Sequence, residues 1–139
     1  MHLFVPLLAV TSKRMRAGYD AALAQKGGSF TLWLALNNLT REGGLKQRDL
    51  AERMFLEEAT ITRHLDRFEQ SSLIERRPDP QDRRVSRLFI TPSGQACYAE
   101  LEEVRQRFEH MLLEGLDEQE LEVLIQALKH LQANLDAQP

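Results

Sequence analysis

Apolar residues recur at intervals of three and four over most of this chain, and that spacing is typical of amphipathic helices. The clear departure is the stretch from Leu73 to Ile90, where apolar and polar residues alternate as they do in strands. We predict six helices: residues 7–26, 30–42, 46–54 and 57–70, one from Pro92, and one after Asp117.

Capping residues and glycines set the predicted helix boundaries. Pro6 suits the first turn of the first helix, and the pair Gly27-Gly28 ends it. Ser29 is a candidate N-cap for the second helix, which the pair Gly43-Gly44 closes. Thr91 followed by Pro92 gives the fifth helix a strong start, and Gly115 followed by Asp117 separates it from the sixth.

The apolar faces of these helices divide into two groups. Core-facing positions in the central helices are Trp33, Leu36 and Leu39; Leu50, Ala51 and Met54; and Ile61, Leu65 and Phe68. Narrower seams run along the outer helices, at Leu8, Met15, Tyr19 and Leu23; Cys97, Leu101, Val104, Phe108 and Met111; and Leu121, Leu124, Leu128, Leu131 and Leu135. Helices with narrow seams need a partner, so the first and the last two helices predict a homodimer.

The middle of the chain has a recognisable plan. Two short helices are followed by a strand at 73–77, a polar turn at 78–84 and a returning strand at 85–90, and Leu45 is predicted as a short strand beside this hairpin. This is the plan of a winged helix-turn-helix, so the expected fold is mainly α (α+β), with six helices and a small hairpin called the wing.

Two surfaces of this unit suit DNA. The face of the 57–70 helix opposite its apolar stripe carries small, hydroxylated and basic residues, namely Ala59, Thr60, Thr62, Arg63, Asp66 and Arg67. The hairpin carries five arginines, and the negative potential of a narrow minor groove attracts arginine. A solvated helix face and ordinary surface arginines remain the alternative interpretations.

Net charge does not exclude a nucleic-acid partner, although it is −3 overall. Residues 92–139 carry ten acidic and three basic side chains, and the chain before them has a net charge of +4. DNA binding depends on where charge lies rather than on its sum.

Other functional classes lack support in the sequence. No apolar run approaches the ~18 residues that cross a bilayer, and the apolar N-terminus lacks a basic region and a cleavage site, so no membrane association or export is expected. The single cysteine, Cys97, excludes an intrachain disulfide and fits a cytoplasmic protein. No phosphate-binding glycine loop, nucleophile motif or metal-spaced His/Cys cluster is present, so neither an enzyme nor a cofactor is expected.

The chain resembles the MarR family of bacterial transcriptional regulators over its whole length, most specifically in residues 45–94. The matching segments are Leu50-Ala51-Glu52-Arg53-Met54, Ala59-Thr60-Ile61-Thr62-Arg63 with Leu65, Ile74-Glu75-Arg76-Arg77, Asp79-Pro80-Gln81-Asp82-Arg83-Arg84, then Leu88, Ile90-Thr91 and Gly94. The resemblance implies a ligand-responsive regulator, expected to be a repressor, that binds a pseudo-palindromic operator in double-stranded DNA as a homodimer.

The resemblance also assigns roles to residues. The 57–70 helix would enter the major groove with Ala59, Thr60, Thr62, Arg63 and Arg67. The wing would contribute Asp82, Arg83, Arg84 and Arg87. Arg84 is the expected minor-groove residue, held by Asp82, with Arg83 as the alternative. Residues 1–28 and 92–139 would form the dimerisation helices, and residues 29–91 the DNA-binding lobe of one domain.

Family members bind phenolic or other lipophilic ligands between these two parts, and Arg16, Tyr19, Trp33 and His110 are the candidates that the resemblance offers here. Cys97 suits a small buried apolar residue, with redox sensing as the alternative. The chain departs from the family pattern in three places. Phe55 stands where glycine is common in the turn, Lys46 replaces a Ser/Thr cap, and Ser71-Ser72 replaces a glycine-containing helix end.

Two other functions remain open. The winged helix could contact a protein instead of DNA, in which case function would be insensitive to salt. It could also be the dimerisation part of a methyltransferase, although the chain offers no room for a cofactor domain and that role would leave the wing arginines without a purpose.

Overall fold

The computed structural model describes residues 2–138 and confirms a mainly helical chain with a small antiparallel sheet. The helices are α1 Phe4–Ala24, α2 Phe30–Arg41, α3 Gln47–Arg53, α4 Glu58–Gln70, α5 Pro92–Leu112 and α6 Glu118–Asp136. The strands are β1 Leu45–Lys46, β2 Ile74–Pro78 and β3 Ser86–Ile90. Contacts divide the chain into two compact units, the first ending at Phe108 and the second beginning at Glu109.

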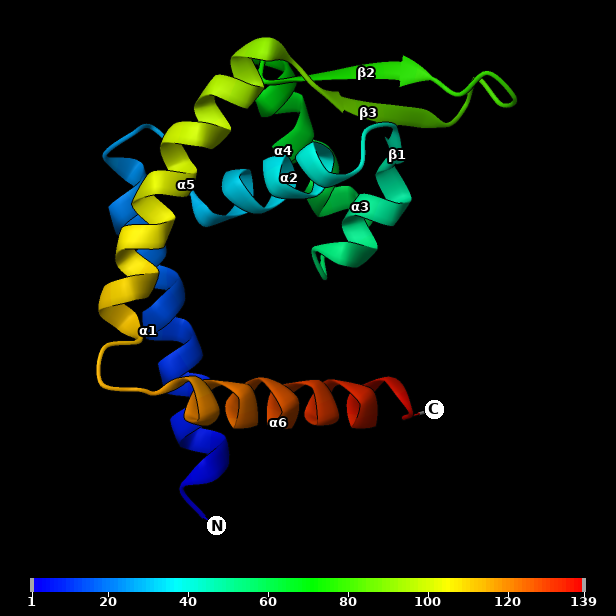
Figure 1. Ribbon diagram of the computed structural model, residues 1–139. Helices are drawn as coiled ribbons and strands as arrows, with labels where there is room; N and C mark the ends of the chain where they lie inside the picture. Colours follow the sequence, from blue (N-terminus) through cyan, green and yellow to red (C-terminus); the bar gives the residue numbers. More distant parts are fainter. Residues whose placement is uncertain (1, 139) are drawn as a thin grey trace. The chain divides into compact units, whose positions relative to one another are not determined.

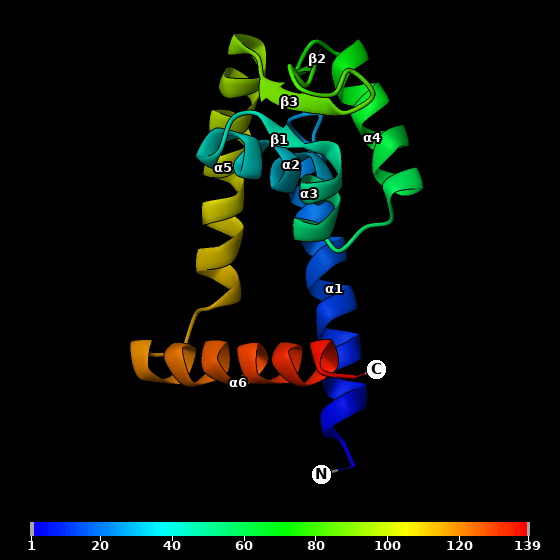
Figure 2. The same ribbon diagram turned by 90° about the vertical axis from the view of Figure 1, so that its right-hand side faces the viewer.

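The sheet has the order β1-β3-β2, so the returning strand of the hairpin is central. Leu45 pairs with Leu88 across β1 and β3, and Ile74 pairs with Ile90 across β2 and β3. These four side chains are apolar, and three of them, Leu45, Leu88 and Ile74, are buried. Helices α2, α3 and α4 lie on one side of the sheet, while the far end of the hairpin extends beyond them (Figures 1 and 2).

The core of the first unit is built from the apolar faces that the sequence predicts. Leu36, Leu39, Leu50, Ile61 and Leu65 are all within 1% of complete burial. Trp33 is an exception, since it is only half-buried. On α1, the predicted seam residues Leu8 and Met15 are exposed, whereas Tyr19 and Leu23 are buried.

The helix ends agree closely with the predicted caps. The Ser29 hydroxyl accepts a hydrogen bond from the Leu32 amide, and the Thr91 hydroxyl accepts one from the Gly94 amide. Asp117 forms a capping box with Glu120 at the start of α6. Helix α1 begins at Phe4, three residues before the predicted boundary. Pro6 therefore falls inside its first turn, where a missing amide proton loses no hydrogen bond.

The two places where the chain lacks an expected glycine both adopt the left-handed conformation. Phe55 has φ +54° in the turn between α3 and α4, and Ser72 has φ +60° just after α4. The helix-turn-helix geometry is therefore kept by residues for which it is strained. At Lys46, the third departure, no side chain caps α3.

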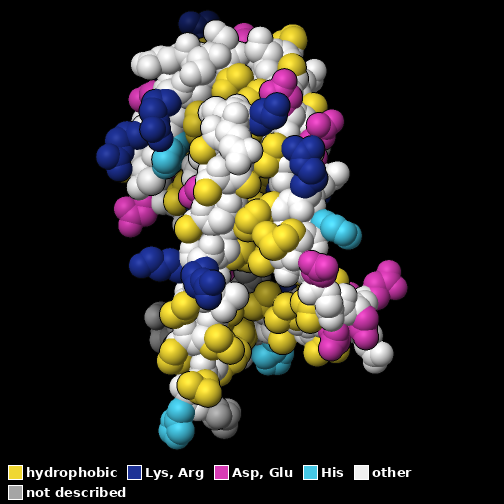
Figure 3. Space-filling view, turned by 90° about the vertical axis from the view of Figure 1, so that its left-hand side faces the viewer, with side chains coloured by type: hydrophobic (Ala, Val, Ile, Leu, Met, Phe, Trp, Pro, Cys, Tyr) yellow, Lys and Arg dark blue, Asp and Glu magenta, His cyan; other side chains and the backbone are white. Residues whose placement is uncertain are grey.

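Apolar side chains remain exposed on the outer helices. On α1, Phe4, Val5, Leu7 and Val10 are at least half exposed, and Figure 3 shows hydrophobic side chains gathered over the N-terminal part of this helix. Helix α6 has no buried residue, and its exposed apolar side chains are Val123, Leu124, Ile125, Leu128 and Leu135.

Candidate nucleic-acid interface

Helix α4 presents a small and basic face to solvent. Ile61, Leu65 and Phe68 fix its apolar stripe in the core, which leaves Ala59 and Arg63 exposed on the opposite side. Arg63 makes no ion pair within residues 2–138, so its guanidinium is available to a ligand. The small Ala59 side chain lets the helix come close to a ligand, and Arg63, one turn away, offers five N–H donors to it.

Thr62 has a more internal role than its sequence pattern suggests. Its hydroxyl donates to the Glu58 carbonyl at 2.7 Å and accepts from the Gln47 side-chain amide at 2.7 Å. Gln47 is the first residue of α3, so this contact joins the two helices of the helix-turn-helix. Sequence reasoning missed Gln47 because nothing local marks a partner 15 residues away.

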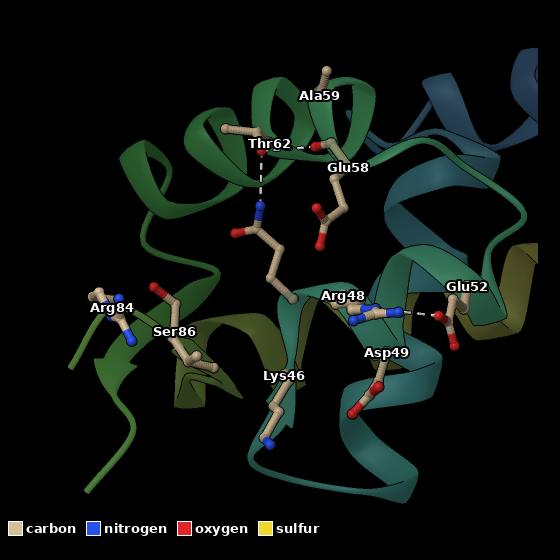
Figure 4. Close-up of a pocket in the computed structure, with 11 residues that line it drawn as sticks. Lys46, Arg48, Asp49, Glu52, Glu58, Ala59, Thr62, Arg84 and Ser86 are labelled. Carbon is tan, nitrogen blue, oxygen red and sulfur yellow. Dashed lines mark hydrogen bonds and ion pairs between the residues drawn. The ribbon is translucent and has the colours of Figure 1, made fainter. Parts of the chain in front are cut away.

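An open groove of about 840 Å³ runs between α3, α4 and the wing. Lys46, Arg48 and Arg84 line it together with Asp49 and Glu58, so its walls carry both signs of charge. Figure 4 shows the Glu58 carboxylate pointing from α4 towards α3, with Arg84 on the wing at the other end of the groove. Of the residues predicted to contact DNA, Ala59 and Thr62 from α4 and Arg84 from the wing line this same groove.

Arg67 and His64 form a pair on the exposed side of α4. The Arg67 guanidinium donates to His64 Nδ1 at 2.7 Å. The pKa of His64 is lowered, first by burial and then by the positive charges of Arg67, Arg63 and Arg16. His64 is therefore held neutral, as an acceptor that orients Arg67.

A second residue that sequence reasoning missed, Arg76, fastens α4 to β2. Its guanidinium contacts Asp66 at 2.7 Å and Glu69 at 3.2 Å, and its side chain is only 19% exposed. The Arg76 backbone amide also donates to Glu69 at 3.2 Å. The motif Ile74-Glu75-Arg76 placed Arg76 on the hairpin but gave no sign that it faces the helix.

The tip of the wing presents Arg84 to solvent in a restrained pose. Its side chain is 91% exposed, and the Nε and Nη2 groups donate to the two carboxylate oxygens of Asp82 at 3.2 and 3.4 Å. The Arg84 amide donates to the same carboxylate, and the hydrogen bonds from Arg84 lower the pKa of Asp82. The expected contact between Asp82 and Arg84 is present, and Arg83 beside them is exposed.

Arg87 points back into the protein. Its Nε donates to Asp79 at 2.6 Å and its Nη1 donates to the Gly44 carbonyl at 2.9 Å. Asp79 is buried, and its hydrogen bonds from the Gln81 amide and from Arg87 lower its pKa. Both arginines have two donor groups bonded within the chain, but the Arg87 side chain is 38% exposed against 91% for Arg84, and one of its bonds reaches Gly44, outside the hairpin.

Three of the four candidate ligand residues gather around Phe30. Arg16 lies 4.7 Å from the Phe30 ring centroid, and Tyr19 and Trp33 have ring centroids at 5.4 and 5.6 Å from it. The Arg16 guanidinium also donates to the Thr31 hydroxyl at 2.7 Å. His110, the fourth candidate, is exposed and belongs to the second unit.

The edge of this aromatic cluster carries a charged network. Glu102 accepts hydrogen bonds from the Trp33 indole at 2.7 Å and from Arg105 at 2.8 and 2.9 Å. These bonds, that of Arg105 above all, lower the pKa of Glu102 to about 2. Cys97 is half-buried and its pKa is raised by burial, which disfavours the reactive thiolate.

Residues 2–138 contain neither a metal-binding cluster nor a membrane-spanning helix. No three His, Cys, Asp or Glu side chains are grouped in a way that could hold a metal ion. None of the described helices combines the length and the apolar character needed to span a membrane.

The arrangement of a helix-turn-helix followed by a two-stranded wing defines a winged helix-turn-helix protein. Residues 29–86 match the MarR family. The structure superposes on the transcriptional regulator PA3341 with a TM-score of 0.86 and 34% sequence identity, over 97% of this chain and 99% of that one. The chain belongs to the MarR family.

Two other solved structures share the fold. A MarR-family transcriptional regulator from Silicibacter pomeroyi is 26% identical, with a TM-score of 0.79 over 95% of this chain and 89% of that one. A MarR mutant from E. coli, solved in complex with operator DNA, is 20% identical, with a TM-score of 0.86 over 94% of each chain. At 20% identity, the similarity to this MarR mutant shows that the two proteins share a fold.

Proposed function

We propose that this protein is a transcriptional regulator, not an enzyme, that binds a pseudo-palindromic operator in double-stranded DNA as a homodimer. The observation that carries the proposal is the pairing of two basic surfaces in one unit, Arg63 on the exposed face of α4 and Arg84 at the tip of the wing. The fold shared with a MarR protein complexed with operator DNA supports it. An operator is part of the chromosome, so a protein that binds one is expected in the cytoplasm.

In this proposal α4 lies in the major groove. Ala59 and Thr60 in the first turn of α4 allow the helix to approach base edges closely, and Arg63 supplies donors for a guanine. Arg67, held by His64, lies one turn further along and suits a phosphate. Thr62 acts mainly by keeping α3 and α4 in register.

The wing follows the DNA into the adjacent minor groove. The Asp82 carboxylate reduces the conformational freedom that Arg84 has to lose on insertion, which favours binding. Arg83 is placed for the flanking phosphates. The mixed charges of the groove between α4 and the wing favour one register of the phosphate backbone, because Glu58 and Asp49 repel it.

The homodimer follows from the exposed apolar side chains on α1 and α6. A chain with this many exposed large apolar residues on two helices is expected to bury them against another copy. A two-fold dimer presents two copies of α4 to half-sites about 34 Å apart, one turn of DNA.

The cluster around Phe30 is the proposed site for an effector. Aromatic rings flanked by Arg16 suit a small lipophilic or phenolic compound that carries one acceptor group. Binding there would change the pose of α1 and α2 relative to the operator and release the DNA, which is the behaviour of a repressor.

Selection of bound sequences from a random duplex pool tests this proposal. We expect a two-fold symmetric sequence bound with a Kd of roughly 10⁻⁸–10⁻¹¹ M at physiological salt. Affinity should fall steeply as salt rises, because bound counterions are released. Arg84→Ala should weaken binding, whereas Arg53→Ala, at the end of α3 outside the groove, should not. Recovery of no preferred duplex would overturn the proposal.

A further inference from the structure

Asp79 is the one buried polar or charged residue among those that the structure describes. Its relative exposure is 4%, and it lies at the point where β2 passes into the wing loop, defined as residues 79–85. Its carboxylate accepts from the Gln81 amide at 2.8 Å and from Arg87 Nε at 2.6 Å. A carboxylate at this burial is tolerated because both of its oxygens are hydrogen-bonded.

Arg87 joins that carboxylate to the body of the protein. Its second donor group reaches the carbonyl of Gly44, in the turn between α2 and β1, at 2.9 Å. Gly44 is itself fixed, since its φ of +80° needs a glycine and its amide donates to the Leu88 carbonyl. One side chain therefore connects the wing loop with the loop that precedes β1.

The position of Arg87 in the sheet makes this connection important. β1 is only two residues long, and Lys46 and Arg87 are the last pair that it forms with β3. Beyond Arg87 the wing consists of β2 and β3 alone, with Pro78 and Ser86 as its final pair. Two-stranded ribbons twist and bend more easily than wider sheets.

Apart from the bond from Arg87, the hydrogen bonds described for the wing loop join residues of the loop itself. The Asp79 amide donates to the Val85 carbonyl at 2.8 Å, and the Val85 amide donates to the Asp82 carbonyl at 3.0 Å. These bonds fix the shape of the loop, and with it the relation of Arg84 to Asp82. They do not fix the direction in which the loop points.

We propose that Arg87 is a positioning residue that sets the direction of the wing, and that it acts on DNA through Arg84 and not through a contact of its own. The proposal rests on the proposed function. Asp79 and Gly44 hold the Arg87 guanidinium at the base of the wing, and its side chain is 38% exposed against 91% for Arg84, so Arg87 is the less accessible of the two to a phosphate. Its place at the last three-stranded position makes it the link between the wing loop and the DNA-binding lobe.

The test compares two duplexes and five variants. One duplex carries the selected operator with its flanks, and the other is trimmed so that the flanking minor groove is absent. The variants are Arg84→Ala, Arg87→Met, Arg87→Lys, Asp79→Asn and the double variant Arg84→Ala/Arg87→Met. Binding is measured by fluorescence anisotropy, and thermal unfolding is measured for each variant.

We expect Arg84→Ala and Arg87→Met each to lower affinity for the full duplex roughly tenfold, the size of one lost arginine contact. Asp79→Asn and Arg87→Lys should lose nearly as much, since neither preserves the bridge from carboxylate to carbonyl. The double variant should bind as Arg84→Ala does, because both changes remove the same contact. On the trimmed duplex every variant should bind as the wild type does.

The matched control is Arg77→Met. Arg77 faces Arg87 across the strands, so this change removes an equal charge from the same hairpin and leaves the contact between Arg87 and Asp79 intact. Any loss it causes should multiply with that of Arg84→Ala when Arg77→Met and Arg84→Ala are combined in one chain, in contrast to the loss from Arg87→Met.

Several outcomes would overturn the inference. If the losses from Arg84→Ala and Arg87→Met multiply, or if Arg87→Lys binds normally, Arg87 contacts DNA itself. Weak binding of Arg87→Met to the trimmed duplex would show a general loss of structure instead. Normal binding by Arg84→Ala would show that the wing makes no contact with the DNA. If the wild type selected no duplex, the proposed function would be wrong as well.

Discussion

Phe55 combines two unfavourable features in one residue. Its φ is +54°, and its side chain is 80% exposed at the turn between α3 and α4. The left-handed conformation costs a non-glycine residue about 1–2 kcal/mol, and the exposed ring contributes little burial in return. The turn of the helix-turn-helix is therefore kept against local preference by the packing of the helices on either side.

Phe55→Gly should stabilise the protein for this reason. The relieved strain exceeds the extra entropy that glycine gives to the unfolded chain, so we expect a gain of about 0.5–1 kcal/mol in the free energy of unfolding. Urea denaturation measures it. Phe55→Ala is the matched control, because it removes the ring and keeps the strain. Equal stability of the alanine and glycine variants would show that the backbone conformation costs nothing here.

Glu102 makes stability depend on pH. Its pKa falls from 4.5 to about 2 in the folded protein, so the folded state favours the carboxylate. The resulting stabilisation is complete above the unfolded pKa and is lost as the pH falls from about 4.5 to about 2.

Glu102→Gln should therefore be less stable than the wild type at neutral pH, by about 1.5–3 kcal/mol, the range for hydrogen bonds to a charged group. The difference should shrink through this acid range, and chemical denaturation at a series of pH values measures it. Gln106→Ala is a suitable control, since it removes one neutral donor to Glu102 and keeps the carboxylate. If the stability difference between Glu102→Gln and the wild type did not change with pH, the ion pair with Arg105 would not be its cause.

At the scale of elements, local signals predict the helices and strands well. Ser29, Thr91 and Asp117 each cap the helix that the sequence assigns to them. The contacts that join elements follow no local pattern. Gln47 meets Thr62 across 15 residues, and Arg87 meets Gly44 across 43.

The same limit applies to the candidate site. An arginine's place in the sequence does not show whether it faces solvent or another element, and only the family resemblance singled out Arg84 among the five hairpin arginines. In the structure Arg84 is exposed, while Arg76 is largely buried against α4. That difference comes from tertiary packing, which a single sequence does not reveal.

Arg76→Met should loosen the attachment of α4 to β2. The variant loses the ion pairs with Asp66 and Glu69 but keeps most of the apolar stem, so we expect a loss of about 1–2 kcal/mol in the free energy of unfolding. Thermal and urea unfolding measure it. Arg48→Met, which breaks an exposed pair with Glu52, should stay within about 0.5 kcal/mol of the wild type. Similar losses from both changes would contradict a special role for Arg76.

At the scale of the whole molecule, the exposed apolar residues of α6 predict association. Leu128→Glu places a carboxylate where the proposed dimer buries a leucine, so the dimer should weaken roughly a hundredfold or more. Sedimentation equilibrium distinguishes the 16.0 kDa chain from a species of twice that mass. Gln126→Glu adds the same charge to the same helix outside the predicted seam and should leave the dimer intact. A monomeric wild type would contradict the prediction.

The spacing of the operator's half-sites follows from the same dimer. Two copies of α4 in one rigid dimer reach two major grooves on one face of the duplex, about 34 Å apart. Insertion of about five base pairs between the half-sites turns one of them to the opposite face, so affinity should fall to the non-specific level. Insertion of about ten restores the face but doubles the distance, and a rigid dimer should still bind weakly. Gel-shift titration of the three duplexes measures this. Equal affinity for all three would mean that each half-site is bound independently, and the exposed faces of α1 and α6 would then need a different partner.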